Sequence, residues 1–337
     1  MIPTQAMPDI LTRARDAVTP ALAAALERLT PDLRRIATYH LGWTDLDGQV
    51  TPGGGGKGVR PALAVLSAEA GWADGDIGVP GGVAVELIHN FSLLHDDIID
   101  GDRTRRHRPT VWAAVGVGPA IVAGDALMAL AQQVLLECPR GAAAARCLTD
   151  ATAAMIAGQA DDIAFESRRE VTVTDCMAMS AGKTGALLGC AASIGAVLAG
   201  APETTAGALR DYGAHLGLAF QAVDDLLGIW GDPERTGKPA GADLRQHKKT
   251  MPIVAALCSG CDEAQELGRM LADGPLDDEQ VERATWLVEA CEGRSWTANQ
   301  AKAHLDKALR ALERVRINPM AHRELADLAT FVVERES

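Results

Sequence analysis

The sequence has 337 residues and a formal net charge of −13 at neutral pH, with a sequence pI near 5.1. Nucleic-acid-binding proteins usually carry the opposite, basic charge balance, so the composition argues against that class. The length exceeds the usual size of one domain, but no linker rich in proline or serine divides the chain. We therefore expect a single domain over residues 1–337, with a loosely packed segment at about 1–20.

Alanine and leucine dominate long stretches of the chain, and β-branched residues are few there. This composition favours helices, for example over 122–137 and 142–158. Glycine and proline cluster between such stretches, at 52–56, 72–82, 116–119, 200–202 and 231–241. The sequence therefore predicts an all-α protein, a helical bundle with its site in a central cavity between facing helices.

The first segment whose side chains could bind a substrate is the loop GGGGKGVRP at 53–61, which contains Lys57 and Arg60. An ammonium group binds phosphate as a point charge, and a guanidinium group binds it with two parallel hydrogen bonds. Further basic residues follow two acidic clusters downstream: Arg103, Arg105, Arg106 and Arg108 after the first, and Lys238, Lys248 and Lys249 after the second. This set suits a substrate with more than one phosphate.

The first acidic cluster lies in the segment 95–109, HDDIIDGDRTRRHRP. On a helix, Asp96 and Asp100 share one face, with Asp97 beside them. Apolar neighbours indicate that this helix borders a cavity, where repulsion between the carboxylates favours a bound cation. Mg²⁺ takes one or two carboxylates and fills its other positions with water and phosphate oxygens. The cluster therefore predicts a magnesium-diphosphate site.

The second acidic cluster, in the segment 220–239, has Asp224 and Asp225 preceded by Gln221, but Gly228 stands where a further carboxylate would complete the pattern. A single aspartate pair is more often a solvated helix face than a metal site. Two clusters in apolar surroundings, each followed by basic residues, favour the metal site. We expect Asp224 and Asp225 to suffice, because the charged segment after them is intact.

Neither the apolar segments nor the cysteines indicate a membrane or extracellular protein. The segment 113–136 is apolar, but Gly116 and Pro119 interrupt it and Asp125 would lie within the bilayer. The first 30 residues lack the apolar stretch of a signal peptide. Seven scattered cysteines do not resemble a disulfide framework, and the CxxC at 258–261 has no second pair at zinc spacing. We expect no transmembrane segment and a cytoplasmic location.

Six motifs in order make the chain resemble the trans-isoprenyl diphosphate synthases, also called polyprenyl synthetases, over about residues 30–254. They are GGGGKGVRP at 53–61, VELIHNFSLLHDDIID at 85–100, RRHRPT at 105–110, GKTGAL at 182–187, FQAVDD at 220–225 and GKPAGADLRQHKKTMP at 237–252. The resemblance implies the all-α isoprenoid synthase fold and a homodimer whose subunits each carry a complete site.

The resemblance also implies roles for individual residues. Three Mg²⁺ ions are expected, two on Asp96 and Asp100 and one on Asp224, with Asp97 and Asp225 acting through water or second-shell contacts. The allylic diphosphate would be held by Arg105, Lys183 and Lys238, and the diphosphate of isopentenyl diphosphate by Lys57, Arg60, His89 and Arg106. Thr184 and Gln221 would face the reacting carbons. Lys248 fits the family's later lysine, although Lys249 is an alternative.

The implied reaction ionises an allylic diphosphate, condenses the cation with isopentenyl diphosphate and eliminates a proton. Phe91 followed by Ser92 resembles the type that makes geranylgeranyl diphosphate, so we expect a C20 product, with C15 second. Alternatively, Phe91 is only core packing. Two other functions stay open: a terpene cyclase, which would not need the second diphosphate pocket, and a non-catalytic subunit, against which the complete first acidic cluster argues.

Overall fold

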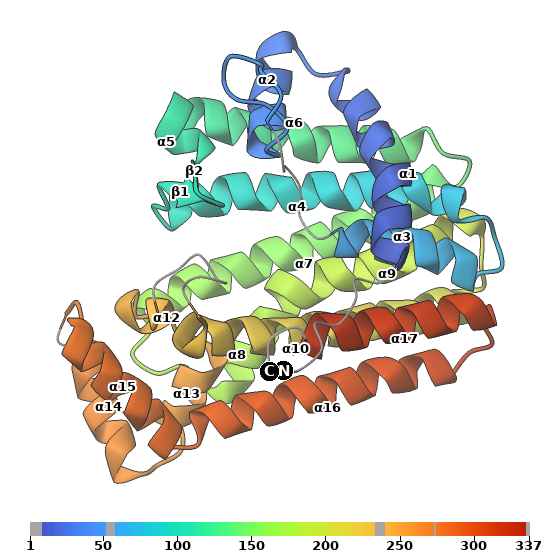
Figure 1. Ribbon diagram of the computed structural model, residues 1–337. Coiled ribbons are helices and arrows are strands. Elements are labelled where there is room, and N and C mark those ends of the chain that lie inside the picture. Colours follow the sequence, from blue (N-terminus) through green and yellow to red (C-terminus); the bar gives the residue numbers. More distant parts are fainter. Residues whose placement is uncertain (1–8, 52–57, 233–239, 273, 335–337) are drawn as a thin grey trace. The chain divides into compact units, whose positions relative to one another are not determined.

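The computed structural model describes residues 9–51, 58–232, 240–272 and 274–334 (Figure 1). Helices dominate these residues, and their strands form one two-stranded antiparallel hairpin, β1 (Thr104–Arg105) with β2 (Arg108–Pro109). The all-α prediction is therefore confirmed. Contacts divide the chain into two compact units, which are described separately. Unit 1 comprises residues 1–152, 187–213 and 311–328, and unit 2 comprises 153–186, 214–310 and 329–337.

The helices that belong wholly or almost wholly to unit 1 come mainly from the first half of the chain. They are α1 (Asp9–Leu26), α2 (Pro31–His40), α3 (Val59–Ala70), the short 3-10 helix η1 (Gly75–Gly78), α4 (Val79–Ile99), α5 (Val111–Val115), α6 (Val117–Leu136) and α9 (Ala186–Ala199). Four long helices contribute residues to both units: α7 (Gly141–Ser167), α10 (Glu203–Trp230), α16 (Gly293–Glu313) and α17 (Pro319–Glu334).

Unit 1 has its core around α4, which packs along α6 and α3 (Figure 1). Glycines allow the close approach of helix backbones. A Cβ atom on Gly78 would lie 2.3 Å from the carbonyl oxygen of Ala64 on α3, and one on Gly195 of α9 would lie 2.1 Å from the same oxygen. The Gly195 amide also donates a hydrogen bond to the buried Ser67 hydroxyl. These contacts hold α4, which carries the first acidic cluster, in a dense helical core.

Several helix boundaries agree with the glycine and proline clusters in the sequence. The stretches 122–137 and 142–158 lie almost entirely in α6 and α7. Gly116 separates α5 from α6 with a φ of 101°, a conformation that favours glycine. Pro119 lies in the first turn of α6, where a missing amide hydrogen costs little.

The N-terminal expectation needs correction for the described residues. We expected loose packing over about 1–20, but residues 9–20 are part of α1. The side chains of Ile10, Leu11 and Ala14 are almost completely buried, and α1 contacts α3 and α4. The apolar positions recur at helical spacing, so this segment has a buried face despite its charged residues.

Unit 2 contains the shorter helices of the second half of the chain: α8 (Val173–Ser180), the π-helical turn η2 (Ala181–Gly185), α12 (Ala242–Arg245), α13 (Met251–Leu257), α14 (Asp262–Ala272) and α15 (Asp278–Ala290). Helices α14 and α15 pack against each other, with Leu267 and Leu287 fully buried in their core. Asp277 begins α15 with a capping box, in which its side chain and that of Gln280 each bond the other's backbone amide.

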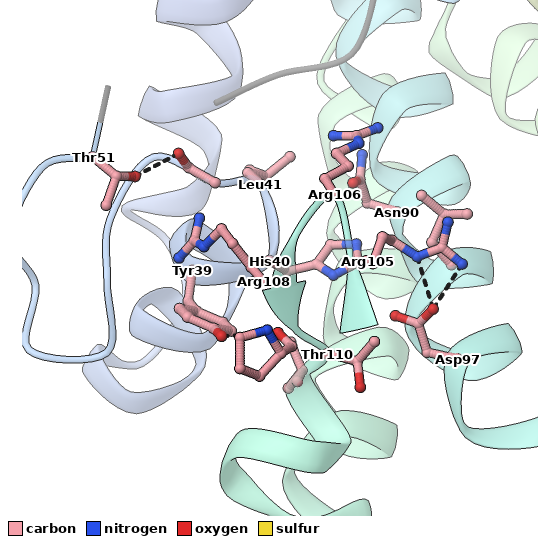
Figure 2. A pocket seen from close by; sticks show the side chains of 14 residues that line it. Tyr39, His40, Leu41, Thr51, Asn90, Asp97, Arg105, Arg106, Arg108 and Thr110 are labelled. Atoms are coloured by element: carbon pink, nitrogen blue, oxygen red, sulfur yellow. Dashed lines mark hydrogen bonds and ion pairs between the residues drawn. The ribbon is translucent and has the colours of Figure 1, made fainter. Parts of the chain in front are cut away.

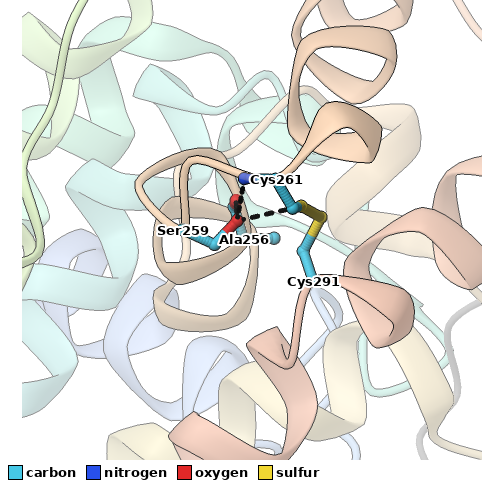
Figure 3. The surroundings of a disulfide bond; sticks show 4 residues. All are labelled: Ala256, Ser259, Cys261 and Cys291. Carbon is cyan, nitrogen blue, oxygen red and sulfur yellow. Dashed lines mark hydrogen bonds between the residues drawn. A yellow bond between two sulfur atoms is a disulfide. The ribbon is translucent and has the colours of Figure 1, made fainter.

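The cysteine expectation also needs correction, because Cys261 and Cys291 form a disulfide (Figure 3). Cys261 directly precedes α14 and Cys291 directly follows α15, so the pairing of these helices brings the two Cα atoms to 6.4 Å. The separation of 30 residues in sequence hides this proximity. The CxxC partner Cys258 remains a free thiol.

Three described helical segments are long and apolar enough to cross a membrane by length and composition alone: Gly75–Ile99, Val117–Leu136 and Val173–Ala199. Within the structure, 61%, 39% and 72% of their most apolar windows are buried, respectively. The first and third are therefore core helices of the bundle. The second has an exposed apolar face that includes Ile121 and Val122.

Candidate active site

The C-terminal end of α4 positions the first acidic cluster. Asp97 is almost fully buried, Asp96 is half-buried and Asp100 is exposed at the end of the helix. Oδ1 of Asp97 accepts a hydrogen bond from Nε of Arg105 at 2.7 Å and forms an ion pair with Nη2 of the same side chain, also at 2.7 Å. The buried Oδ2 of Asp97 has no partner within the described part of the chain. Burial raises the pKa of this carboxyl group, although the Arg105 guanidinium opposes the shift.

The β1–β2 hairpin presents the arginines that follow this cluster. Its two turn residues, Arg106 and His107, have φ values of 51° and 61°, which identifies a type I′ turn without the usual glycine. Such conformations cost non-glycine residues about 1 kcal/mol or more each. Contacts at the strand end hold the hairpin in place, since the Tyr39 hydroxyl donates to the Pro109 carbonyl at 2.8 Å.

Three of the four residues predicted to hold isopentenyl diphosphate lie close together in unit 1. Burial lowers the pKa of His89 well below its usual value, and the charges of Arg60 and Arg106 lower it further. The buried Nε of Arg60 has no hydrogen-bond partner among the described residues. The fourth predicted residue, Lys57, lies outside the described residues. The described three form a cationic site in which His89 is neutral.

Phe91, the predicted chain-length residue, is 6% exposed on α4. Its ring packs edge-on against His95 with centroids 4.8 Å apart, and a Cβ atom on Gly124 of α6 would lie 3.5 Å from the ring. Ser92 is half-buried and donates a hydrogen bond to the His89 carbonyl at 2.8 Å. The Phe91 ring is thus packed between α4 and α6. This position is compatible with both predicted roles, a limit on product length and core packing.

In unit 2, Lys183 and Thr184 lie in the π-helical turn η2, an irregularity that is frequent at functional sites. Glycines create room for it: a Cβ atom on Gly158 would lie 2.3 Å from the Lys183 amide nitrogen, and one on Gly217 would lie 2.7 Å from the Gly185 Cα. The Lys183 ammonium group donates to Asp162 Oδ2 at 2.5 Å.

A hydrogen-bonded chain connects η2 to the second acidic cluster on α10. The Thr184 hydroxyl donates to Gln221 Oε1 at 2.6 Å, and Gln221 Nε2 donates to Asp225 Oδ1 at 2.7 Å. The other Asp225 oxygen accepts from the Met251 amide at 2.9 Å. Burial raises the Asp225 pKa to about 8, with smaller increases from the charges of Asp243 and Asp224. Gln221 is thus placed by the same network that fixes Asp225.

Gly228, where the second cluster lacks a carboxylate, faces a carboxylate from another helix. A Cβ atom on Gly228 would lie 2.0 Å from Oδ2 of Asp243 on α12, so a side chain cannot be added there without displacing Asp243. The Asp243 charge also acts on Asp225. The cluster therefore has a third acidic group nearby, supplied from position 243 instead of 228.

The later lysines differ in their surroundings. The Lys249 ammonium group donates to the Arg168 carbonyl, and burial lowers its pKa. Lys248 is half-buried, and its backbone amide bonds the Asp243 carbonyl at 2.9 Å. Lys238 lies outside the described residues.

Sequence reasoning missed three residues that contact or adjoin these groups: His40, Asp162 and Asp243. Asp162 belongs to an aspartate pair at 161–162, and Asp243 to the quoted motif at 237–252, so both carried a usable signal. His40 lies at the end of α2 and belongs to none of the motifs, and only the folded chain brings it to Arg105 and Arg106.

The acidic residues fit a hard divalent cation. Carboxylate oxygens are the ligands that Mg²⁺ prefers, and a buried carboxylate oxygen without a partner, as on Asp97, is normally satisfied by a cation or water. Burial is the main cause of the raised Asp225 pKa, and the charges of Asp243 and Asp224 add smaller increases. A bound cation would offset both effects.

Comparison with known proteins identifies the class. The model of the polyprenyl synthetase family matches residues 48–288. The chain is 45% identical over 334 residues to (2E,6E)-farnesyl diphosphate synthase of Mycobacterium tuberculosis, covering 97% of this chain and 93% of that protein. It is 44% identical, with the same coverage, to a geranylgeranyl diphosphate synthase of that organism. A crystal structure of a polyprenyl synthetase from Streptomyces coelicolor matches with a TM-score of 0.93 and 51% identity, covering 96% of this chain and 99% of that one.

The chain belongs to the polyprenyl synthetase family and has the all-α isoprenoid synthase fold. It is a trans-prenyltransferase of isoprenoid biosynthesis, and its family uses a divalent metal. The resemblance seen in the motifs is confirmed.

Proposed function

We propose that this protein condenses isopentenyl diphosphate with an allylic diphosphate, head to tail and with Mg²⁺, to give geranylgeranyl diphosphate. The observation that carries the proposal is the cationic site of Arg60, His89 and Arg106 in the same unit as Asp96 and Asp100. A terpene cyclase has one diphosphate to bind and needs no such second set of cations. A synthase must bind two diphosphates at once.

By family resemblance, Asp96, Asp100 and Asp224 are the proposed metal ligands, and three ions are expected. When bound, the ions neutralise negative charge on the departing diphosphate. Asp97 acts through Arg105, which it orients, and Asp225 acts through Gln221. Asp243 adds a carboxylate beside Gly228, which supports the view that the departure at 228 leaves the second cluster functional.

We propose that the allylic diphosphate is bound by Arg105, Lys183 and Lys238. This diphosphate is the leaving group, and it departs with the electrons of the C1–O bond. Charge stabilisation by fixed cations is the main catalytic contribution of such side chains. The double bond of isopentenyl diphosphate then attacks C1, and the released diphosphate takes the proton. The second substrate is held by Lys57, Arg60, His89 and Arg106, with its double bond positioned against C1 of the allylic substrate. The bimolecular step then behaves as an effectively unimolecular one. Because Lys248 lies two residues before Thr250, as the family's later lysine does, we assign that lysine to Lys248.

Thr184 and Gln221 are proposed to line the space beside the allylic carbons. Their hydrogen bond fixes both side chains, so neither needs to reorganise when charge develops at C1. Oxygen atoms near the cation also stabilise it electrostatically. No side-chain base is required, since the diphosphate accepts the final proton.

Product length is the finer part of the proposal. Phe91 is buried on α4, five residues before Asp96. We propose that its ring is the floor of the product tunnel, which means that it stops the growing hydrocarbon chain at C20. The alternative is C15, favoured by the 45% identity to a farnesyl diphosphate synthase.

We further propose a cytoplasmic homodimer, supported by the exposed apolar residues Ile121 and Val122 on α6, which a second subunit would cover.

Incubation of the purified protein with Mg²⁺, isopentenyl diphosphate and, separately, dimethylallyl, geranyl and farnesyl diphosphates tests the proposal. Mass spectrometry should detect a linear C20 diphosphate. A C15 product, or one longer than C20, would keep the synthase and reject Phe91 as the C20 floor. A cyclic hydrocarbon formed without isopentenyl diphosphate would identify a cyclase, and no turnover of any primer would favour a non-catalytic subunit.

A further inference from the structure

A cavity of about 180 Å³ lies within unit 1, between the end of α2, the C-terminal half of α4 and the β1–β2 hairpin (Figure 2). Its lining is rich in basic groups, with three arginines of one hairpin, Arg105, Arg106 and Arg108, and a single acid, Asp97. The volume is large enough for a phosphate group with water. Its charge therefore suits an anion.

The three arginines differ in how far the protein already uses them. Arg105 is bound to Asp97. Arg108 donates to the Thr44 carbonyl at 2.8 Å and stacks on the Tyr39 ring at 4.5 Å. Arg106 is exposed, and it forms no hydrogen bond or ion pair with the residues that the structure describes. Arg106 is thus the guanidinium group most available to a ligand.

His40 also has unused hydrogen-bonding capacity, as does Oδ2 of Asp97 in the same lining. The Asn90 side chain lines the same cavity and opposes the lowering of the His40 pKa. The Nε2 atom of His40 is buried and has no partner among the described residues. An unpartnered buried polar atom costs about 1–3 kcal/mol, so its persistence in a basic cavity indicates a ligand that completes it.

The electrostatic surroundings of His40 are those of an anion site. Arg105 and Arg106 face it from the hairpin, while His89, Asn90 and Asp97 face it from α4. Burial and the two arginines lower the His40 pKa to about 3, so the ring is neutral without a ligand. A phosphate charge beside Nε2 offsets this field and favours a proton on Nε2, either as the neutral Nε2–H tautomer or as the imidazolium ring.

A second cavity of about 120 Å³ adjoins the first, because both are lined by Leu41, Asn90 and Arg106. Its lining includes Gly58 and Pro61, which flank the predicted phosphate-binding Arg60. Two adjoining cavities that share Arg106 match the two phosphate groups of one diphosphate. This places His40 at one end of the cationic site that includes Arg60 and His89.

We propose that His40 is a further substrate-binding residue, which donates a hydrogen bond from Nε2 to a phosphate oxygen of isopentenyl diphosphate next to Arg106. The inference rests on the proposed function for the identity of this ligand. Inorganic diphosphate carries the same two phosphate groups and could bind the same residues. The binding experiments below therefore measure isopentenyl diphosphate and inorganic diphosphate separately.

Calorimetric titration with isopentenyl diphosphate alone, without a primer, measures binding independently of turnover. We expect His40→Phe, which keeps a ring but lacks the donor, to bind about 10-fold more weakly or worse, the usual effect of losing a hydrogen bond to a charged group. His40→Gln, which retains a donor, should recover part of the affinity. His322→Gln on α17, a half-buried histidine outside this site, is the matched control and should bind as the wild type does.

Steady-state kinetics supply the second readout. The KM for isopentenyl diphosphate should rise about 10-fold in His40→Phe, while the KM for the allylic substrate and kcat stay within about threefold, since a ground-state contact raises KM alone. A merely structural role would change both KM values together. Equal losses for the two substrates, or unchanged affinity in a folded His40→Phe variant, would overturn the proposal.

The remaining outcomes separate the inference from the proposed function. If inorganic diphosphate loses affinity with His40→Phe but isopentenyl diphosphate does not, the cavity binds a different anion and the proposal is wrong. If the wild type turns over no primer, the proposed function fails, yet weaker isopentenyl diphosphate binding in His40→Phe would still support the inference. Thermal unfolding of each variant identifies a folding defect, in which case His40→Leu, which also lacks the donor, replaces His40→Phe in both measurements.

Discussion

The two acidic clusters differ in how completely the protein satisfies their polar groups. In unit 2, both oxygens of Asp225 are bonded, one to Gln221 and one to the Met251 amide. In unit 1, Oδ1 of Asp97 is bound by Arg105, and its Oδ2 has no partner among the described residues. The protein thus satisfies both oxygens of the buried aspartate in the second cluster, whereas the buried aspartate in the first keeps one oxygen for a ligand. Stability and function should respond differently to substitutions in the two.

The largest effect should come from the acids of the first cluster. Asp96→Asn removes a proposed metal ligand and should lower kcat/KM by about 100-fold or more, a typical cost of losing transition-state charge stabilisation. Steady-state kinetics with saturating Mg²⁺ would measure it. Asp125→Asn on α6 changes an exposed acid outside the cluster and should retain activity. An Asp96→Asn variant with wild-type activity would remove Asp96 from the metal site.

Phe91→Ala should affect both stability and product. Truncating a buried phenylalanine costs about 3–5 kcal/mol, and removal of the ring should extend the longest product beyond that of the wild type. Urea unfolding and product mass spectrometry measure the two effects. Phe165→Ala removes a ring that is equally buried in unit 2, so it should destabilise without lengthening. Unchanged product length in Phe91→Ala would leave Phe91 as core packing alone.

Arg105→Ala tests the buried ion pair in the first cluster. It leaves the Asp97 carboxylate, only 2% exposed, without its partner. Breaking a fully buried pair costs about 3–5 kcal/mol, and because Arg105 is 32% exposed we expect a loss of about 2–3 kcal/mol of unfolding free energy. Asp97→Asn in the same chain should restore part of this stability because it removes the unpaired charge. Chemical denaturation of the two single variants and the double variant measures the coupling. Additive losses would show that the pair is unimportant for stability.

Gly228→Ala tests the arrangement in the second cluster. The new Cβ would lie 2.0 Å from Asp243 Oδ2, so we expect a loss of about 1–3 kcal/mol, typical of overpacking. Adding Asp243→Ala should make the Gly228→Ala substitution far less costly than it is in the wild type. A double-mutant cycle by urea unfolding measures this coupling. Equal costs in the two backgrounds would contradict the observed contact.

The smallest effect should be the pH dependence from His304 in unit 2. Its Nδ1 lies 3.1 Å from Nδ1 of His215, and burial, followed by the charges of Lys307 and His215, lowers its pKa to about 4. The unfolded chain therefore binds more protons between about pH 6.5 and 4, so stability is full above pH 6.5 and is lost as the pH falls toward 4. We expect about 1 kcal/mol of this loss to disappear in His304→Gln, measured by urea unfolding at pH 7 and 4.5. An unchanged difference between the two pH values would assign the loss to other groups.

Helical class and most proposed site residues could be predicted from the sequence, because local composition and short motifs carry them. Asp96 and Asp100 are four residues apart on one helix, so their shared face follows from helical geometry. The GKTGAL motif predicted Lys183 and Thr184, although the π-helical turn that holds them depends on close glycine contacts with α7 and α10. Such contacts join residues far apart in sequence and leave no local pattern.

The sequence by itself determined the family, the chemistry of the acidic and basic clusters and the absence of a carboxylate at Gly228. Only the tertiary structure decided that Asp243 faces Gly228, that Cys261 pairs with Cys291, that residues 9–20 pack as a helix and that His40 joins the arginines of the hairpin. The physical reason is that motifs record which groups are present along the chain. Burial, and the partner that satisfies each buried polar group, depend on long-range packing.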